Sequence, residues 1–322
     1  MAFEPAVGRC LITGASGFVG RHLFQRMDLL GLPVRGASRQ ALGATGDWVQ
    51  VDVRGGSTDW RAALLDCDSV VHAAGRAHVL KEQACDPLAL FREANVDVTL
   101  ALAEQALMMG VKRFVFISSI GVSGNVTSTG QPFTEQQRPQ PHAPYAVSKL
   151  EAEQALTRLL AGTSMELVIV RPPLVYASHA PGNFARLLGL VHRRLPLPFG
   201  SVENARSMVA LENLVDFLMC CLRHPSAAVQ TFLVADGEDL STAELIRVLA
   251  DGMGHTPRLV PVPTALLALG ARLTGRMSMY QQLCLSLQVD TSKARSLLGW
   301  RPPVCARTAL RQTSRNWYDS RS

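Results

Sequence analysis

Short apolar runs alternate with longer amphipathic stretches through the first half of the chain. Runs of strand type lie at 7–13, 33–38, 48–53, 69–72, 113–118 and 167–170, and helical spacing occurs at 59–65, 87–109 and 145–160. A further amphipathic stretch ends near residue 30. Strands and helices that alternate in this way indicate βαβ units, which build a parallel sheet with helices on both faces. The pattern predicts an α/β fold with a Rossmann-type, doubly wound parallel sheet.

The turn that follows the first apolar run is rich in glycine. Gly14, Gly17 and Gly20 stand between the strand and the next helical stretch. Glycines at this place let backbone N–H groups approach a pyrophosphate at the helix N-terminus, where the helix dipole favours an anion. We therefore expect a dinucleotide at this turn, with Phe18 and Val19 among its contacts.

The ends of the second and third strands bear on which dinucleotide binds. A carboxylate at the end of the second strand would bind the adenosine ribose and favour NAD. The chain has Ser38 and Arg39 there, and a hydroxyl with a guanidinium suits the 2′-phosphate of NADP. NADP(H) is the favoured cofactor and NAD(H) the alternative. Asp52 and Val53 end the third strand, where the carboxylate caps the adenine amino group or starts a turn.

Small residues follow the buried strand at 69–72. They are Ala73, Ala74 and Gly75. Small side chains at the carboxyl end of a strand allow a flat ligand to lie against the backbone. Asn95 lies within the apolar face of the next helical stretch and must find hydrogen-bond partners, either on a ligand or on a neighbouring loop.

Tyr145 and Lys149 are four residues apart in a stretch with helical spacing, so they share one face of the helix. An ammonium group beside a phenol stabilises the phenolate, and a lowered tyrosine pKa makes the phenol a useful proton shuttle near neutral pH. An isolated pair with this spacing is more often a half-buried tyrosine beside a solvated lysine. The glycine turn upstream favours the catalytic interpretation.

The pattern changes after Tyr176, where prolines and turns multiply. A helix is predicted at 242–253, since Ser241 and Glu244 have the spacing of a capping box. Shorter elements are expected at 215–222 (helix) and 231–234 (strand). We predict a dinucleotide-binding domain and a smaller α/β C-terminal substrate-binding domain, with the boundaries 1–176 and about 207–235 for the first, and about 177–206 and 236–322 for the second.

Composition excludes several classes of protein. The net charge of the 322 residues is +6 and aromatic residues make up 6%, without a block of lysine and arginine, so no nucleic-acid groove is implied. The seven cysteines contain no Cys-x-x-Cys pair, which argues against a disulfide framework and a zinc site. No apolar run approaches the ~20 residues of a membrane span. We expect a soluble cytoplasmic protein without a metal site.

Taken together, these motifs resemble the extended short-chain dehydrogenase/reductase family, and within it the NAD-dependent epimerases, dehydratases and 4-ketoreductases of nucleotide sugars. The motifs in family order are the three glycines, His72-Ala73-Ala74-Gly75, Ser119, Tyr145 with Lys149, and Arg171-Pro172-Pro173-Leu174-Val175-Tyr176. The resemblance implies that Tyr145 is the acid/base, that Lys149 holds the nicotinamide ribose, and that Ser119 bonds the reacting oxygen. Further implied cofactor contacts are Ser118, Pro172 and Val175. Relatives often dimerise, so a homodimer is expected.

The same resemblance implies a UDP-sugar substrate. Asn183 and Arg206 are expected near its diphosphate and Phe199 against the uracil, and Asp290 matches an acidic residue near the substrate in relatives. Dehydratases carry an Asp-Glu pair where this chain has Ile120-Gly121, so dehydration is not expected.

Three functions fit these residues. We expect first an NADPH-dependent reductase of a UDP-4-keto-hexosamine in polysaccharide (O-antigen) precursor synthesis, because Ser38-Arg39 replaces the acidic residue of strict NAD enzymes. The alternative is a 4-epimerase of UDP-glucose or UDP-N-acetylglucosamine with bound NAD. A non-catalytic dinucleotide-binding regulator is a third function, against which the intact Ser119, Tyr145 and Lys149 argue.

Overall fold

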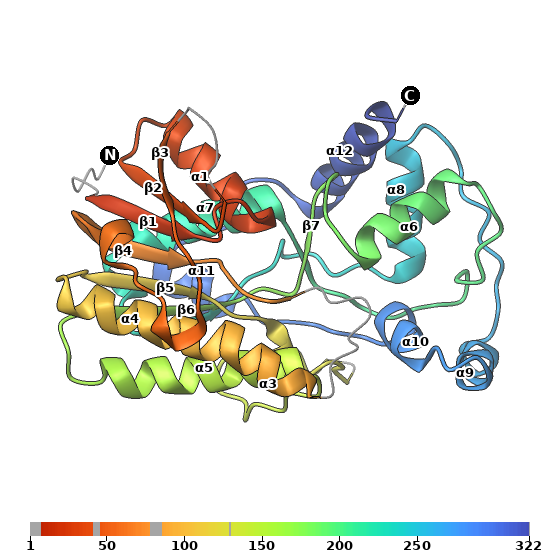
Figure 1. The fold of residues 1–322 in the computed structure, drawn as a ribbon. Coiled ribbons are helices and arrows are strands. Elements are labelled where there is room, and N and C mark those ends of the chain that lie inside the picture. Colours follow the sequence, from red (N-terminus) through yellow and green to blue (C-terminus); the bar gives the residue numbers. More distant parts are fainter. Residues whose placement is uncertain (1–7, 41–45, 78–85, 129, 322) are drawn as a thin grey trace.

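The computed structural model describes residues 8–40, 46–77, 86–128 and 130–321. Within these residues, seven parallel strands form one sheet in the order β3-β2-β1-β4-β5-β6-β9 (Figure 1). The strands are β1 Arg9–Thr13, β2 Val34–Ser38, β3 Asp47–Gln50, β4 Cys67–His72, β5 Arg113–Ile117, β6 Glu166–Arg171 and β9 Gln230–Leu233. The predicted doubly wound sheet is confirmed. The order changes direction between β1 and β4, and ligands of such sheets bind outside the carboxyl ends of the strands at that point.

Helices cover both faces of this sheet (Figure 1). Two separate buried clusters, one on each face, hold the layers together. The first includes Leu23 and Phe217 and the second includes Leu102 and Leu156. On the first face lie α1 Phe18–Leu29, α7 Leu211–Arg223 and α11 Ser292–Leu298, and on the second α2 Arg61–Leu64, α4 Val98–Met108 and α5 Pro144–Leu160.

The helix predicted at 87–109 runs without a break over 87–108, but it is not α-helical throughout. It consists of α3 Pro87–Arg92, a π-helical turn η2 Glu93–Asp97, and α4. The π turn contains the buried Asn95. Such turns are frequent at functional sites, and this one lies against α5.

A second group of elements lies beyond the carboxyl ends of the strands (Figure 1). It has a buried cluster of its own, built around Phe184, Leu249 and Trp317. The predicted capping box starts α8, since Ser241 and Glu244 bond each other's backbone N–H groups. The elements are β7 Leu174–Tyr176, β8 Met208–Ala210, α6 Asn183–His192, α8 Thr242–Gly252, α9 Thr264–Leu273, α10 Met277–Cys284 and α12 Ala306–Asp319. The domain boundaries drawn from the sequence stay a prediction.

Three short 3-10 helices complete the elements, η1 Gly55–Ser57, η3 Ile120–Val122 and η4 Pro225–Ala227. No helix in the described part of the chain has the length and the apolar character needed to cross a membrane.

Candidate active site

The glycine turn between β1 and α1 is too tight for side chains at two of its three glycines. Gly14 has φ +65°, and a Cβ there would lie 2.7 Å from the Ala74 backbone. A Cβ on Gly20 would lie 2.3 Å from the Gly14 carbonyl oxygen. Gly17 is the N-cap of α1 and gives its N–H groups no side-chain cap. The first N–H groups of a helix have no partner within it, so this end of α1, at Phe18 and Val19, is suited to an anion.

His72, at the end of β4, fixes the backbone beside this turn. Its Nδ1 lies 2.6 Å from the Thr13 hydroxyl and its Nε2 lies 2.9 Å from the Thr99 hydroxyl. Burial, and then the charge of Lys149, lower the pKa of His72 to about 3, so the ring is neutral. The Ala74 N–H donates to the same Thr13 hydroxyl. Sequence reasoning gave His72 no role of its own, although its place between an apolar strand and Ala73-Ala74-Gly75 was a signal.

Asn95 uses its amide on protein atoms rather than leaving it free for a ligand. Its Oδ1 accepts from the Arg76 N–H at 2.8 Å. Its two amide protons go to the Arg76 carbonyl at 3.1 Å and the Ser148 hydroxyl at 3.0 Å. Asn95 therefore ties the loop after Gly75 to α5. Its expected contact with the cofactor stays a prediction.

The ends of β2 and β3 carry the residues expected at the adenosine. The Ser38 hydroxyl donates to the Gln40 carbonyl, and Arg39 is exposed. Asp52 pairs with Arg54 at 2.5 Å, and both side chains are more than 70% exposed. Val53 is exposed as well. The β2 end thus presents a guanidinium, as expected, and the Asp52 carboxylate is held in a surface ion pair.

Tyr145 and Lys149 lie in the first turns of α5, which begins at Pro144. Tyr145 is half-buried, with its ring edge-to-face against Phe91 at 6.1 Å between centroids. The buried Lys149 donates from Nζ to the Ile117 carbonyl at 2.8 Å and lies 4.4 Å from the centre of the Phe116 ring.

The lowered pKa expected for Tyr145 is wrong for this structure. Burial raises the pKa of Tyr145 to about 12, and Lys149 does not counter it. The ammonium is instead directed at the Ile117 carbonyl. Burial lowers the pKa of Lys149 to about 8, and the charge of Glu153 acts in the opposite direction.

Ser118 and Ser119 follow β5 directly and differ in environment. The Ser118 hydroxyl is buried without a hydrogen-bond partner among the described residues. Ser119 is half-buried, and its hydroxyl accepts from the Gly121 N–H at 3.1 Å. The Ile120 N–H, directly after these serines, donates to the carbonyl of Pro172, which follows the end of β6. Ser118 and Lys149 thus meet at the end of β5, because Lys149 bonds the residue just before Ser118.

Three of the expected substrate residues, Arg206, Asn183 and Phe199, lie in different surroundings. Arg206 is half-buried, donates to the Leu285 carbonyl at 2.9 Å, and has its pKa lowered by burial. Asn183 opens α6 and bonds the Gln282 side chain. Phe199 packs against the buried cluster of the second group of elements, and this packing accounts for a phenylalanine at the position without a ligand. No hydrogen bond in the described part of the chain joins these residues.

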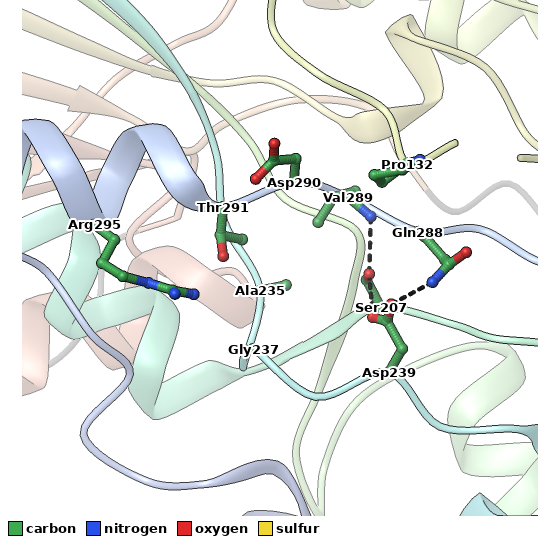
Figure 2. Close-up of a pocket in the computed structure, with 10 residues that line it drawn as sticks. All are labelled: Pro132, Ser207, Ala235, Gly237, Asp239, Gln288, Val289, Asp290, Thr291 and Arg295. Atoms are coloured by element: carbon green, nitrogen blue, oxygen red, sulfur yellow. Dashed lines mark hydrogen bonds between the residues drawn. The ribbon is translucent and has the colours of Figure 1, made fainter. Parts of the chain in front are cut away.

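Asp290 lines a cavity of ≈ 250 Å³ (Figure 2). Its carboxylate accepts from the Ser292 N–H at 2.8 Å, at the start of α11. Figure 2 shows it directed away from Asp239, which bonds Ser207 at 2.5 Å and Gln288 at 2.8 Å. This cavity holds one of the substrate residues predicted from the sequence, Asp290. The full lining is Pro132, Ser207, Ala235, Gly237, Asp239, Gln288, Val289, Asp290, Thr291 and Arg295.

The fold and this site define a dinucleotide-binding enzyme of the short-chain dehydrogenase/reductase type. The model of the NAD dependent epimerase/dehydratase family matches residues 10–235, and the chain belongs to that family. The resemblance inferred from the sequence is confirmed.

Relatives and solved structures agree with this membership. A UDP-glucose 4-epimerase from Vibrio cholerae is 42% identical over 307 residues, with 94% of each chain covered. An N-acetyl-α-D-glucosaminyl-diphospho-ditrans,octacis-undecaprenol 4-epimerase from Escherichia coli O157:H7 is 26% identical, covering 89% of this chain and 88% of its own. The structure of a UDP-N-acetylglucosamine 4-epimerase from Bacillus cereus has a TM-score of 0.79 at 18% identity, over 96% and 99% of the two chains.

Proposed function

We propose that the protein is a UDP-sugar 4-epimerase that works with a bound nicotinamide dinucleotide. The observation that carries the proposal is that Tyr145 and Lys149 share the first turns of α5, with Lys149 at the end of β5, in a chain that is 42% identical to a UDP-glucose 4-epimerase over nearly its whole length. This reverses the order of preference drawn from the sequence, in which a reductase came first.

The residues present fit a dinucleotide. The uncapped N-terminus of α1 and the tight turn at Gly14 suit the pyrophosphate. The buried Ser118 hydroxyl has an unused donor at the end of β5. A Cβ on Gly75 would lie 3.1 Å from Asn95 Oδ1 and 3.6 Å from Lys149 Nζ, so glycine leaves room between the amide and the ammonium. Uptake of a hydride from the sugar C4 and its return would be the chemistry that a bound nicotinamide supplies.

Proton transfer falls to the protein. Tyr145 accepts the proton of the C4 hydroxyl as the ketone forms, and it gives the proton back when the hydroxyl is restored on the opposite face. Ser119 donates a hydrogen bond to the same oxygen and holds it near the phenol. Lys149 would donate to the ribose hydroxyls from its place at the Ile117 carbonyl. The positive charge of an oxidised nicotinamide would lower the pKa that burial raises at Tyr145.

An epimerase must hold the nucleotide while the 4-keto sugar turns its other face to the nicotinamide. Arg206 supports this requirement, because its side chain is half-buried and, among the described residues, its guanidinium donates to the Leu285 carbonyl and forms no ion pair. A half-buried cation without a counter-charge favours an anionic ligand, and the guanidinium fork matches a diphosphate. We assign Arg206 to the UDP diphosphate, with Asn183 at the start of α6 beside it.

The test is the release of cofactor from purified protein after denaturation, together with conversion of UDP-glucose or UDP-N-acetylglucosamine to the 4-epimer without added cofactor. We expect about one NAD(H) per chain and the 4-epimer as product. An empty protein that oxidises NADPH only in the presence of a UDP-4-keto sugar would refute the epimerase and establish the reductase.

The reductase remains the second candidate because of the end of β2. No acidic residue stands there, and the exposed Arg39 suits the 2′-phosphate of NADP. A reductase releases its spent cofactor, so an NADPH-selective surface serves it better. Arg39→Ala tests this, since it should weaken NADP binding roughly tenfold while leaving NAD binding unchanged. Equal effects on both dinucleotides would remove the argument for NADP.

A further inference from the structure

Helix α9 carries a stripe of exposed leucines. Leu266, Leu269 and Leu273 follow one another at spacings of three and four residues, which places them on one face of the helix. Their side chains are 58%, 53% and 80% exposed. All of α9 lies in the described part of the chain, and none of its residues is buried.

The stripe faces away from the rest of the molecule. On the other side of the helix Leu267, Ala268 and Ala271 are half-buried, and α9 packs against α10. Figure 1 shows α9 and α10 together at the end of the molecule remote from the seven-stranded sheet. Met279 on α10 adds a side chain that is 50% exposed. The leucines therefore have no function in the core of this chain.

The charge of the surrounding segment is one-sided. The chain has 26 Asp and Glu residues, yet none of them lies between Asp251 and Asp290. The same segment contains Arg258, Arg272 and Arg276, and all three are exposed. Arg272 lies within α9 and Arg276 lies three residues beyond its last residue, so the apolar stripe has two cations near its carboxyl end.

We propose that α9 docks on the surface of a lipid bilayer that contains anionic phospholipid. An amphipathic helix of this kind lies in the plane of the interface, with its apolar face at the boundary between headgroups and acyl chains. Arginines beside that face reach the lipid phosphates with their guanidinium groups. The absence of carboxylates from the segment removes the repulsion that an anionic surface would otherwise exert.

A second copy of this chain fits the stripe less well. Twofold pairing through α9 would place four arginines, Arg272 and Arg276 of each copy, in one interface, and the segment offers no carboxylate to pair with them. Stable interfaces also bury about 800 Å² on each partner, and three leucines on one ten-residue helix cover only a part of that area. Charge complementarity therefore favours the bilayer.

Co-sedimentation with vesicles tests the proposal on the full-length protein. We expect the protein to bind vesicles of phosphatidylcholine mixed with phosphatidylglycerol, to bind pure phosphatidylcholine weakly, and to be released by salt. The triple variant Leu266→Gln, Leu269→Gln, Leu273→Gln should bind roughly a hundredfold more weakly. Arg272→Gln with Arg276→Gln should lower binding roughly twentyfold on the anionic vesicles and leave binding to phosphatidylcholine unchanged.

The matched control removes equally exposed apolar side chains elsewhere. Leu29, Leu65 and Met108 are 81%, 55% and 83% exposed, and the triple glutamine variant at these positions should bind vesicles as the wild type does. Glutamine keeps helix propensity, and an unchanged thermal transition shows that each variant folds. Equal binding of the α9 variant and the wild type, or equal binding to neutral and anionic vesicles, would overturn the proposal. Loss of a dimer in the α9 variant, without vesicle binding by the wild type, would overturn it in favour of a second copy.

Discussion

Glu153 on α5 and Arg171 on β6 form a buried, bidentate ion pair, and Glu153 lies one helical turn beyond Lys149. Arg171 donates from Nε to Glu153 at 2.9 Å and from Nη2 at 2.5 Å, and both side chains are less than 10% exposed. Glu153 is four residues after Lys149, on the same face of the helix, and its charge raises the pKa of that lysine. The pair thus fixes α5 to the sheet, and the Glu153 carboxylate offsets part of the cost of burying the Lys149 ammonium.

Breaking this pair on one side should destabilise the protein strongly. Glu153→Gln leaves the Arg171 guanidinium buried without a counter-charge, and such single losses cost about 3–5 kcal/mol. The double variant Glu153→Leu, Arg171→Met removes both charges and should recover most of that loss. Chemical denaturation measures both effects. A single variant as stable as the double variant would contradict the expected coupling.

Replacing Lys149 with methionine should stabilise the protein at neutral pH while removing activity. The lysine pKa falls from 10.5 to about 8 on folding, so between these values the unfolded chain binds more protons and stability rises with pH. At pH ~7 the lowered pKa corresponds to a cost of about 3 kcal/mol in the stability of the wild type, which the methionine variant removes. Loss of the bond to the Ile117 carbonyl should offset about 1 kcal/mol of that gain.

Denaturation at several pH values checks this expectation. The gain of Lys149→Met over the wild type should shrink as the pH rises from about 8 to about 10.5. Lys112 is the matched control, because its side chain is 78% exposed and Lys112→Met should change stability by less than about 1 kcal/mol at either pH. A Lys149 variant that is less stable than the wild type at neutral pH would refute the inferred cost of burying the ammonium.

The local features of this site could be predicted from the sequence, because they depend on residues close together in the chain. The glycine turn, the four-residue spacing of Tyr145 and Lys149 and the capping box at Ser241 are of this kind. The parallel, doubly wound sheet could also be predicted, since strands and helices that alternate along the chain indicate βαβ units.

Features that depend on distant partners were missed. The direction of the Lys149 ammonium is set by a carbonyl 32 residues away, so the assumption that it points at Tyr145 gave the wrong sign for the tyrosine pKa. Glu153 was not predicted to matter, because only the fold shows that it pairs with Arg171. The π turn at Asn95 has no sequence signal apart from a buried polar residue in an apolar helix.

Tyr145→Phe should abolish turnover and spare cofactor binding. Loss of a positioned acid/base typically lowers the rate by roughly 10²–10⁴-fold. The variant keeps the ring that packs against Phe91, so the fold and the dinucleotide site should be unaffected. Steady-state kinetics and titration with NAD(H) measure the two properties. Tyr280→Phe, at a half-buried position on α10, is the control. Wild-type turnover in Tyr145→Phe would remove the acid/base assignment.

His72 should make the fold sensitive to acid. Its pKa falls from 6.5 in the unfolded chain to about 3 in the folded one, so below pH ~6.5 the unfolded chain takes up a proton that the folded chain refuses. Stability should therefore fall by about 1.4 kcal/mol per pH unit from pH ~6.5 towards about 3.

His72→Gln isolates this contribution, because the glutamine amide can still bond the Thr13 and Thr99 hydroxyls while carrying no titrating group. The stability difference between wild type and variant should change by roughly 3 kcal/mol between pH 7 and pH 4, in favour of the variant at the lower pH. The exposed His142 serves as the control, and His142→Gln should leave the pH dependence unchanged. A His72 variant that parallels the wild type over this range would show that the imidazole is protonated in the folded protein, and the neutral bridge between Thr13 and Thr99 would then be wrong.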